Sequence, residues 1–553
     1  MILPLDQLDA AAPLEATICI VGAGAAGITL ACELDGCGVP VLLLEAGGLH
    51  PDLAASDARY RGTARAPHPN PSEYRRIVFG GTTGTWGGRC VPFDPIDFEK
   101  REHVANSGWP IAYEELARHY PRALEYCDAG ACDFSVAGSL AGAPLPTIPG
   151  LPENDALLAD RIERYSLPTD FGQRYRARIG ASGNVRALLH ARCVGVQRRP
   201  GESRIDALTV LDRAGRRRTV RAQTFVLAVG GIETARLLLQ AEAAGPGLGN
   251  RSDHLGRYYA CHFENVLGRL IGPPGQVAFD FERTRDGVYC RRKLQFTAQA
   301  QQQHRLLNSA FRLHFPPYSD AAHGSPELSA IYLAKSALLR EHRAILQHGT
   351  EAARQSPAIE HLRNVALGLP TLAAFAWRML FERKLAQRKL PYTLVKNRDG
   401  SYPIEFNSEQ TPLATNRVTL VDDTDPDGMR RVHVEWRVAE EDARAAQRGF
   451  LLLRELLRPS ACRLEFDEAA LLQAIGRSVP LGGHHIGTAR MAANERDGVV
   501  DRHCALFEAP NLYIASSAVF CTNSHANPTL TIVALALRLA QHLKEGGGAP
   551  AAG

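Results

Sequence analysis

Two histidines near the C-terminus could carry out proton transfer, and a nearby asparagine could hydrogen-bond and orient a hydroxyl. His484 and His485 follow two glycines, and Asn527 precedes Pro528 and a long helical pattern. A histidine, with an unperturbed pKa of about 6.5, is suited to act as a base at neutral pH. An asparagine followed by a proline is typical of a helix start, and the positive end of that helix can stabilise an alkoxide.

The roles of three side chains in this region remain open. His485 is the nearest rival of His484 as the base, although structural packing is the simpler interpretation for it. His525, two residues before Asn527, is interpreted as a possible pocket residue. If Asn527 caps its own helix, its side chain cannot also point toward a substrate.

The N-terminal stretch predicts a dinucleotide site. An apolar strand pattern over residues 17–21 leads into Gly22, Gly24 and Gly27, then a helix, a second strand and Glu45. The first glycine permits a tight turn, the second lets the backbone approach a pyrophosphate, and the third lets helix and strand pack closely. The pyrophosphate would face the helix N-terminus, and Glu45 would accept hydrogen bonds from ribose hydroxyls. An acid at this position argues against a 2′-phosphate and leaves FAD or NAD open.

Two further glycine-rich turns could contact the same ligand. The loop over residues 80–88 has five glycines and three threonines, which cannot form a helix but can bring N–H and hydroxyl groups close to a ligand. A second strand, turn and helix over residues 224–239 includes Ala228 and Gly230. The chain thus returns to a dinucleotide-type sheet, and substrate-facing segments interrupt the nucleotide domain.

Bulk properties exclude several classes of protein. The 553 residues suffice for two or more domains, and 63 basic against 59 acidic residues require no nucleic-acid partner. The N-terminus lacks the cationic region of a signal peptide, and no run of about 18 uncharged apolar residues predicts a membrane span. The twelve cysteines form no C-x-x-C pair, so we expect reduced thiols and a cytoplasmic location.

Periodicity predicts the elements between these motifs. We expect a helix over 113–127, a strand region over 185–194, a hairpin over 205–221, strands over 267–315, a strand pair over 417–436 and a helix over 439–457. A helical insert over 326–389 is broken at Pro357 and Pro370. Its apolar stretch 365–380 is interpreted as packed on the body of the protein, with an interfacial or partner-docking helix as the alternative.

Five motifs in this order resemble the glucose–methanol–choline (GMC) flavoprotein oxidoreductases. They are GAGAAG with Glu45, FGGTTGTWGG at 79–88, LAVGGIETARLLL at 227–239, HHIGTARM at 484–491 and NPTLTIVALALRLA at 527–540. The resemblance implies an α/β fold, in which a Rossmann-like FAD-binding domain is interleaved with an α+β substrate-binding domain built on an antiparallel sheet. It also implies oxidation of an alcohol to a carbonyl, with hydride passing to flavin N5.

The resemblance also implies site residues. His484 would be the catalytic base, Asn527 its partner, and Val194 would meet the adenine through its backbone. The cofactor-binding residues would be Gly22, Gly24, Gly27, Glu45, Ala46, Gly80, Gly81, Thr82, Thr85, Trp86, Gly87, Gly88, Val194, Ala228, Gly230, Ser516, Pro528 and Thr529. No metal is expected.

Two departures from the family pattern refine this expectation. Thr85 stands before Trp86, where pyranose-oxidase-like members carry a histidine that binds FAD covalently, so noncovalent FAD is predicted. No aspartate lies near Ser516, where many members have one. Both the loop and the last helix resemble the pyranose oxidase and sugar dehydrogenase branch. The expected substrate is therefore a sugar, cyclitol or glycoside, oxidised at a primary or secondary hydroxyl.

The implied domains are discontinuous. The FAD-binding domain is expected over 1–60, 76–100, 184–262 and 478–545, and a disordered tail over 546–553. The substrate-binding domain is expected over 101–183 and 263–477, with the helical insert at about 326–390. These boundaries place the two histidine motifs and the first glycine motif in one domain.

Two other functions remain as alternatives. One is a flavin-containing lyase or decarboxylase of the same fold. The other is a dehydrogenase flavoprotein subunit that acts with a separate electron-acceptor partner. Oxygen, a quinone and a protein all remain open as acceptors, and the sequence does not determine the oligomeric state.

Overall fold

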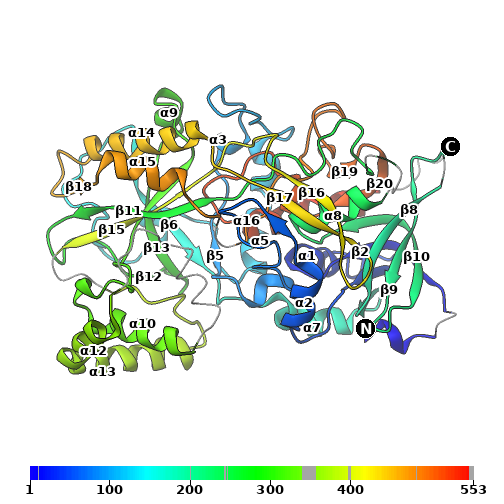
Figure 1. The fold of residues 1–553 in the computed structure, drawn as a ribbon, viewed down its shortest axis with the longest axis horizontal. Coiled ribbons are helices and arrows are strands. Elements are labelled where there is room, and N and C mark those ends of the chain that lie inside the picture. Colours follow the sequence, from blue (N-terminus) through cyan, green and yellow to red (C-terminus); the bar gives the residue numbers. More distant parts are fainter. Residues whose placement is uncertain are drawn as a thin grey trace.

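Two β-sheets lie side by side in the computed structural model and divide the molecule into two halves (Figure 1). The structure describes residues 1–9, 12–199, 201–241, 245, 247–338, 356–395, 400–480 and 483–546. Of the predicted disordered tail, 546–553, only Gly546 falls within these residues.

The first half is built on a nine-stranded sheet. Its order is β1 (Ile2–Pro4), β7 (Val185–Leu189), β3 (Val41–Leu44), β2 (Leu14–Val21), β10 (Arg217–Leu227), β20 (Ala509–Ile514) and β19 (Ala505–Leu506), and the antiparallel strands β8 (Arg192–Arg198) and β9 (Ile205–Leu211) extend from β10. The strands from β1 to β20 are parallel, and β3 is buried along its whole length, as its unbroken apolar run requires. The carboxyl ends of β2, β3, β10 and β20 therefore meet at one edge.

Helices cover this sheet. They are α1 (Ala25–Glu33), α7 (Phe171–Ala181), α8 (Gly231–Gln240) and α16 (Pro528–Lys544), together with α4 (Tyr113–Ala117) and α5 (Tyr120–Tyr126). The predicted helix 113–127 is thus two short helices, with Pro121 in the first turn of the second. The predicted strand region 185–194 is likewise two strands, because His190 adopts a φ of 52° and turns the chain between β7 and β8.

The second half is an antiparallel sheet, as predicted. Its order is β18 (Arg463–Glu465), β11 (Phe263–Ile271), β15 (Ser401–Ser408), β14 (Ser309–Leu313), β13 (Tyr289–Phe296), β6 (Leu157–Tyr165) and β5 (Arg89–Cys90), with β12 (Glu282–Arg283) beside β13. Helices α14 (Glu440–Leu456) and α15 (Glu468–Gly476) cover one face (Figure 1). The Phe450 ring lies 5.2 Å from those of both Phe311 and Phe406, which anchors α14 on the sheet.

Packing divides the chain differently from the predicted domain boundaries in two places. Strands β16 (Arg417–Thr424) and β17 (Arg430–Glu435) pair with β4 (Thr63–Ala64), and Val432 and Trp436 pack against Ile232 of α8. The strand pair assigned to the substrate-binding domain therefore lies against the nucleotide half. Tyr120 and Phe171, from the segment 101–183, also join the core of the parallel sheet.

The helical insert forms a separate layer below the antiparallel sheet (Figure 1). It contains α10 (Pro326–Leu338), α12 (Ala358–Leu367) and α13 (Leu369–Arg378), followed by a π-helical turn, Met379–Lys384. Pro357 precedes α12 and Pro370 lies in the first turn of α13, so both predicted breaks are present. Among the described residues no single helix meets the length and hydropathy required to cross a membrane, although α12 and Leu369–Lys384 do so as a pair bent by 87°.

The remaining elements are short. They are α2 (Leu53–Tyr60), α3 (Pro95–Phe98), α6 (Val136–Ser139), α9 (Ala298–Gln303) and 3₁₀ turns at Leu5–Gln7, Gly81–Gly84, Ala321–His323 and Ser517–Val519.

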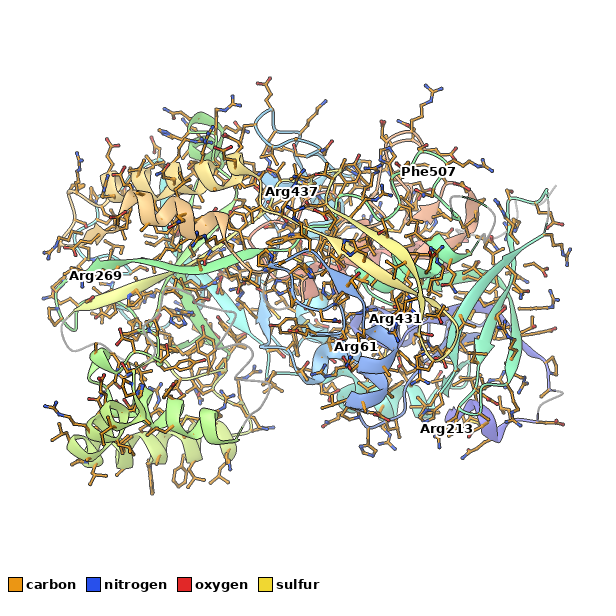
Figure 2. All side chains as sticks on the ribbon, in the orientation of Figure 1. Arg61, Arg213, Arg269, Arg431, Arg437 and Phe507 are labelled. Carbon is orange, nitrogen blue, oxygen red and sulfur yellow. The ribbon has the colours of Figure 1, made fainter. Side chains whose placement is uncertain are left out.

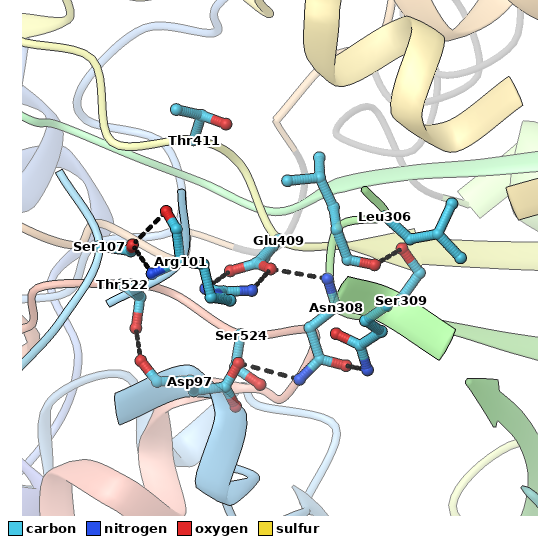
Figure 3. Close-up of polar contacts among 12 residues, drawn as sticks. Asp97, Arg101, Ser107, Leu306, Asn308, Ser309, Glu409, Thr411, Thr522 and Ser524 are labelled. Atoms are coloured by element: carbon cyan, nitrogen blue, oxygen red, sulfur yellow. Dashed lines mark hydrogen bonds and ion pairs between the residues drawn. The ribbon is translucent and has the colours of Figure 1, made fainter. Parts of the chain in front are cut away.

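A buried polar network joins the two halves (Figure 3). Arg101 donates to both carboxylate oxygens of Glu409, at 2.5 and 2.9 Å, and both side chains are fully buried. Asn308 donates to Asp97 at 2.9 Å, and Thr522 donates to the Asp97 carbonyl at 2.7 Å. A buried ion pair of this kind is costly to break, because the remaining charge would have no partner. The network therefore fixes the chain just before Asn527.

Candidate active site

A cavity of about 650 Å³ lies where the carboxyl edge of the parallel sheet faces the antiparallel sheet. One wall consists of the glycine turn after β2, Glu45 after β3 and the turn after β10. The opposite wall includes Tyr165, Glu264 and Glu405 from the antiparallel sheet. The cavity thus brings together segments from both ends of the chain.

Most of the predicted site residues line this cavity. They are Gly22, Gly24, Glu45, Ala46, Gly81, Thr82, Thr85, Trp86, Gly87, Gly88, Ala228, Gly230, His484, His485, Ser516, Asn527, Pro528 and Thr529. Gly27, Gly80, Val194 and His525 do not line it.

Packing explains two of these four absences. A Cβ on Gly27 would lie 1.9 Å from the Gly22 carbonyl oxygen, so this glycine allows close packing of helix and strand. Gly80 has a φ of 105° and donates its N–H to the Ala23 carbonyl at 2.8 Å, which makes it a turn residue behind the cavity wall.

Val194 and His525 also lie outside the cavity lining, and their predicted roles stay predictions. The cavity is lined by Arg192 and Cys193 rather than by Val194, where β8 has an irregularity between Cys193 and Gly195. His525 is buried outside the cavity, and its Nε2 lies 2.7 Å from Lys293 Nζ. Sequence spacing did not predict this because Lys293 comes from β13 in the other half.

The glycine turn fits a pyrophosphate. Gly22 has a φ of 97°, and a Cβ there would lie 2.6 Å from the Ala228 carbonyl oxygen. A Cβ on Gly24, in contrast, would meet nothing within 4 Å, so the backbone is open to the cavity at this point. Helix α1 begins directly after Gly24 with no side-chain cap, which leaves its first N–H groups available to an anion.

Glu45 is held by backbone donors at the end of β3. Its two carboxylate oxygens accept from Ala23 N at 2.9 Å and from Gly47 N at 2.8 Å. Burial raises the pKa of this carboxyl to about 7, against the effect of both hydrogen bonds. Each oxygen can accept one more hydrogen bond, so the carboxyl remains able to bind ribose hydroxyls.

A buried ion network borders the same end of the cavity. Arg75 donates to Glu233 at 2.7 Å, and its guanidinium lies 3.6 Å from the centre of the Tyr60 ring. Arg192 donates to Asp425 at 2.6 Å. Residue spacing did not indicate this network, although Glu233 lies in the first turn of α8, inside the motif at 227–239.

His484 is hydrogen-bonded through both of its ring nitrogens. Its Nδ1 lies 2.8 Å from His262 Nδ1, and its Nε2 lies 3.1 Å from Asn527 Nδ2. His262 Nε2 lies 2.8 Å from the Asn523 carbonyl oxygen. Burial lowers the pKa of His262 to about 4 and that of His484 well below its ordinary value, so both rings are neutral at pH 7.

These contacts determine which nitrogen of each ring carries the proton. A carbonyl oxygen only accepts, so His262 carries its proton on Nε2 and leaves its Nδ1 as an acceptor. His484 Nδ1 therefore donates to His262 Nδ1. The lone pair of His484 is then on Nε2, the atom that accepts from the Asn527 amide. The opposite amide orientation would require a doubly protonated, charged His262, which burial disfavours.

The structure resolves the question about Asn527. Its side chain makes no cap hydrogen bond with its own helix, α16, and is directed at His484 instead. Asn527 Oδ1 is buried without a hydrogen-bond partner among the described residues. A group entering the cavity could therefore bind to His484 and Asn527 together.

His485 has a different environment from His484. Its ring stacks on Tyr259, with 6.1 Å between ring centres, and burial beside Arg75 and His68 lowers its pKa well below the ordinary value. It lines the cavity on the side of the buried ion network. This geometry agrees with the packing interpretation made from the sequence.

The wall that faces His484 is polar. Arg89 is buried, and its Nε and Nη2 have no hydrogen-bond partner among the described residues. The nearest acid is Glu264, whose carboxylate lies 3.8 Å from Arg89 Nη2. Glu405 is held by Arg291 at 2.7 Å and Arg312 at 2.9 Å. A donor and an acceptor thus remain available to a bound molecule.

His262 and Glu264 were missed by the sequence analysis. They lie two residues apart where β11 begins, a spacing that places both side chains on one face of a strand. Ligand atoms of His262, Glu264 and His484 lie within 4.8 Å of one another, so the group could also offer ligands to a metal ion. The direct hydrogen bond between the two histidines accounts for their closeness without one.

Comparison with known proteins gives a consistent result. Residues 412–536 match the family model described as GMC oxidoreductase. The chain is 22% identical to 2-methyl-1,2-propanediol dehydrogenase of Mycolicibacterium austroafricanum, covering 96% of this chain and 95% of the relative. It is 25% identical to paromamine 6'-oxidase of Streptomyces fradiae (95% and 90%) and 23% identical to the fructose dehydrogenase large subunit of Gluconobacter japonicus (95% and 97%).

A solved structure supports the fold. The structure of pyridoxine 4-oxidase from Mesorbium loti superposes with a TM-score of 0.52 at 17% identity, over 95% of this chain and 98% of that one. The likeness covers both sheets and the segments between them. The predicted arrangement of a Rossmann-like domain with an antiparallel substrate-binding sheet is confirmed.

Glu45 predicts a pH-dependent affinity for FAD. Ribose hydroxyls would donate to the carboxylate and so favour its ionised form, which means that binding releases a proton. The affinity of the apoprotein should rise about tenfold per pH unit below pH 7 and level off above it. Quenching of flavin fluorescence between pH 5.5 and 8 measures this. Glu45→Gln should flatten the curve and the exposed-site control Glu455→Gln should not. A flat curve for the wild type would contradict the prediction.

His262 is predicted to position His484 as a base. His262→Phe removes the acceptor for His484 Nδ1–H and should slow flavin reduction by an alcohol about a hundredfold. His262→Asn keeps an acceptor oxygen near the same place and should recover most of the rate. Stopped-flow absorbance gives the rates, and ¹⁵N shifts of the His484 ring report its tautomer. Equal rates in the two variants, with an unchanged tautomer, would show that His262 only fills space.

Proposed function

Since the chain is a GMC oxidoreductase that acts on CH–OH groups with FAD, we propose that its substrate is a sugar, cyclitol or glycoside. The single observation that carries this proposal is the wall opposite His484. There Arg89 and Glu264 are largely removed from water, yet they keep free donor and acceptor positions. Vicinal hydroxyls both donate and accept, so they match such a pair, whereas a hydrocarbon chain would leave both groups unsatisfied.

The names of the relatives support the same substrate class. Paromamine 6'-oxidase and the fructose dehydrogenase large subunit are named for sugar-type substrates. 2-Methyl-1,2-propanediol dehydrogenase is named for a small diol, which shares the adjacent oxygen functions but not the ring. A substrate screen therefore needs sugars, amino sugars, cyclitols and short diols.

Each protein group has a proposed part in the reaction. A substrate hydroxyl placed between His484 and Asn527 would donate to His484 Nε2 and accept from Asn527 Nδ2. The two hydrogen bonds orient the C–H bond and draw the proton to Nε2 as the alkoxide forms. FAD, when bound, supplies the acceptor of the hydride. The N-terminus of α16, which has no side-chain cap, favours negative charge at the same place.

The charge that develops on His484 also has a partner. Proton uptake at Nε2 makes the ring a cation, and His262 can accept the hydrogen bond from Nδ1–H throughout. Glu264 lies within 4.8 Å of both rings and offsets the positive charge. His484 can therefore be neutral before the reaction and still accept a proton during it.

We further propose that FAD is bound noncovalently. The loop beside the cavity presents Thr82, Thr83, Thr85 and Trp86, none of which forms flavin linkages of the histidyl, cysteinyl or tyrosyl type.

The free cysteines, most of them buried, support a cytoplasmic location, which cell fractionation tests. The lyase alternative is not favoured, whereas a separate electron-acceptor partner remains compatible with this site.

The noncovalent attachment has a direct test. Precipitation of the purified holoenzyme with trichloroacetic acid should release all of the flavin into the supernatant, where its absorbance is measured. Yellow, fluorescent protein in the washed pellet would contradict the proposal.

His484 is predicted to be the base. His484→Ala should retain bound FAD and slow its anaerobic reduction by the best substrate of the screen by about 10²- to 10⁴-fold. His485→Ala is the matched control and should retain most of the rate, because that ring faces Tyr259. Loss of activity in the control alone would transfer the role to His485.

Glu264 is predicted to contribute to substrate recognition. Glu264→Gln removes a charged acceptor and should lower kcat/KM for a sugar substrate about 10- to 100-fold. Glu153→Gln, at an exposed position, is the control. If kcat/KM for sugars is unchanged while the variant folds and binds FAD, the wall does not bind the substrate as proposed.

A further inference from the structure

The helices α12 and α13 present an unusual apolar surface. Twelve large hydrophobic side chains of the described residues are classed as exposed, and eight of them lie between Ile359 and Leu385. We call these eight the apolar face. Leu367 is 77% exposed and Trp377 is 66% exposed, and the Trp377 and Phe381 rings lie 4.2 Å apart. Figure 2 shows side chains of these helices projecting away from the rest of the molecule.

The polarity of α12 is the reverse of that of a helix packed on a core. His361 is its buried side chain and contacts Ser329 at 3.1 Å. Asn364 donates to the Ala321 carbonyl at 2.9 Å. Polar groups therefore face the protein, while Ile359, Leu362 and Leu367 face outward. Such an arrangement is favourable only if something apolar covers the outer side.

The insert is attached to the body mainly through polar contacts. Arg378, in α13, donates to both oxygens of Asp280 at 3.1 and 3.3 Å. No residue of α12 or α13 belongs to the hydrophobic core clusters of the described chain. The stretch 365–380 was predicted to pack on the body, but its large apolar side chains Leu367, Leu369, Trp377 and Leu380 are exposed. This exposure supports the interfacial alternative.

The segment that carries the apolar face is basic. Residues 358–389 contain six basic and two acidic residues, a net charge of +4, which equals that of the whole chain. Arg363, Lys384 and Lys389 are exposed and form no ion pair with a described residue. Basic residues beside leucine, tryptophan and phenylalanine are typical of helices that lie in a membrane interface.

We propose that α12 and α13 dock the protein on an anionic lipid surface and lie in the plane of its headgroups. Leu369–Lys384 alone reaches about 24 Å even if fully helical, short of the roughly 30 Å hydrocarbon core, and α12 is bent away from it by 87°, so an interfacial position fits this pair better than a straight span. This proposal is independent of the substrate proposed above.

Vesicle binding of the full-length holoenzyme tests this proposal. The wild type should sediment with phosphatidylcholine vesicles containing 30% phosphatidylglycerol and bind pure phosphatidylcholine at least tenfold more weakly. Brominated lipids should quench tryptophan fluorescence, since Trp377 is the exposed tryptophan and the other three are buried or half-buried. Failure to bind any anionic vesicle would overturn the proposal.

Two sets of variants separate the apolar and charged contributions. Trp377→Gln with Phe381→Gln should lower vesicle binding at least tenfold. The control pair Leu53→Gln with Leu145→Gln, at positions that are 50% and 51% exposed, should not. Arg363→Gln with Lys384→Gln and Lys389→Gln should reduce binding about a hundredfold. The control triple is Lys100→Gln with Arg118→Gln and Arg477→Gln, which removes the same charge from exposed sites.

The oligomeric state distinguishes lipid from a protein partner. Light scattering without vesicles should give the same mass for the wild type and the Trp377/Phe381 variant, and substrate oxidation in solution should be equal. If the wild type is a dimer that this variant dissociates, the apolar face is a contact between copies of the chain and the lipid proposal fails. If vesicle binding survives in both sets of variants, another surface is responsible.

Discussion

The parallel pairing of β10 with β2 on one side and β20 on the other is the constraint on which the site depends. These strands come from the beginning, the middle and the end of the chain. Because they run in the same direction, their carboxyl ends place the Gly22 turn, Ala228 and Ser516 at one edge. The start of α16 then follows at the same cavity. A break in this pairing would separate the cofactor wall from His484 and Asn527.

Burial then gives the site its chemistry. Removing His262 and His484 from water keeps both rings neutral, and the contact of His262 with a backbone carbonyl leaves a single arrangement of protons. The unprotonated nitrogen of the neutral His484 ring is thus Nε2. Glu264 lies close enough to stabilise the cation only after it forms. The same environment strengthens the proposed hydrogen bonds of Arg89 and Glu264 to a polar substrate.

Polar contacts from the second half of the molecule hold these groups in place. The Arg101–Glu409 pair and Asp97 connect β14 and β15 to the segment before Asn527 (Figure 3). The wall opposite the base belongs to the sheet that carries this network. The helical insert is attached differently, through a few side-chain contacts, and directs its apolar residues outward. The proposed docking helices therefore lie outside the polar network that holds the site.

The sequence by itself determined the features that depend on local backbone chemistry. The turn at Gly22, the acid at Glu45 and the start of α16 at Pro528 follow from residue type and spacing, because each is required within a single strand–turn–helix unit. Only the tertiary structure decided which residues meet across units. It brought His262 to His484, directed Asn527 away from its own helix, removed His525 from the cavity and left the apolar face of α12 and α13 uncovered. The physical reason is that these side-chain contacts join residues 43 to 232 positions apart, in different elements, and their geometry depends on how the sheets pack, which spacing along the chain does not encode.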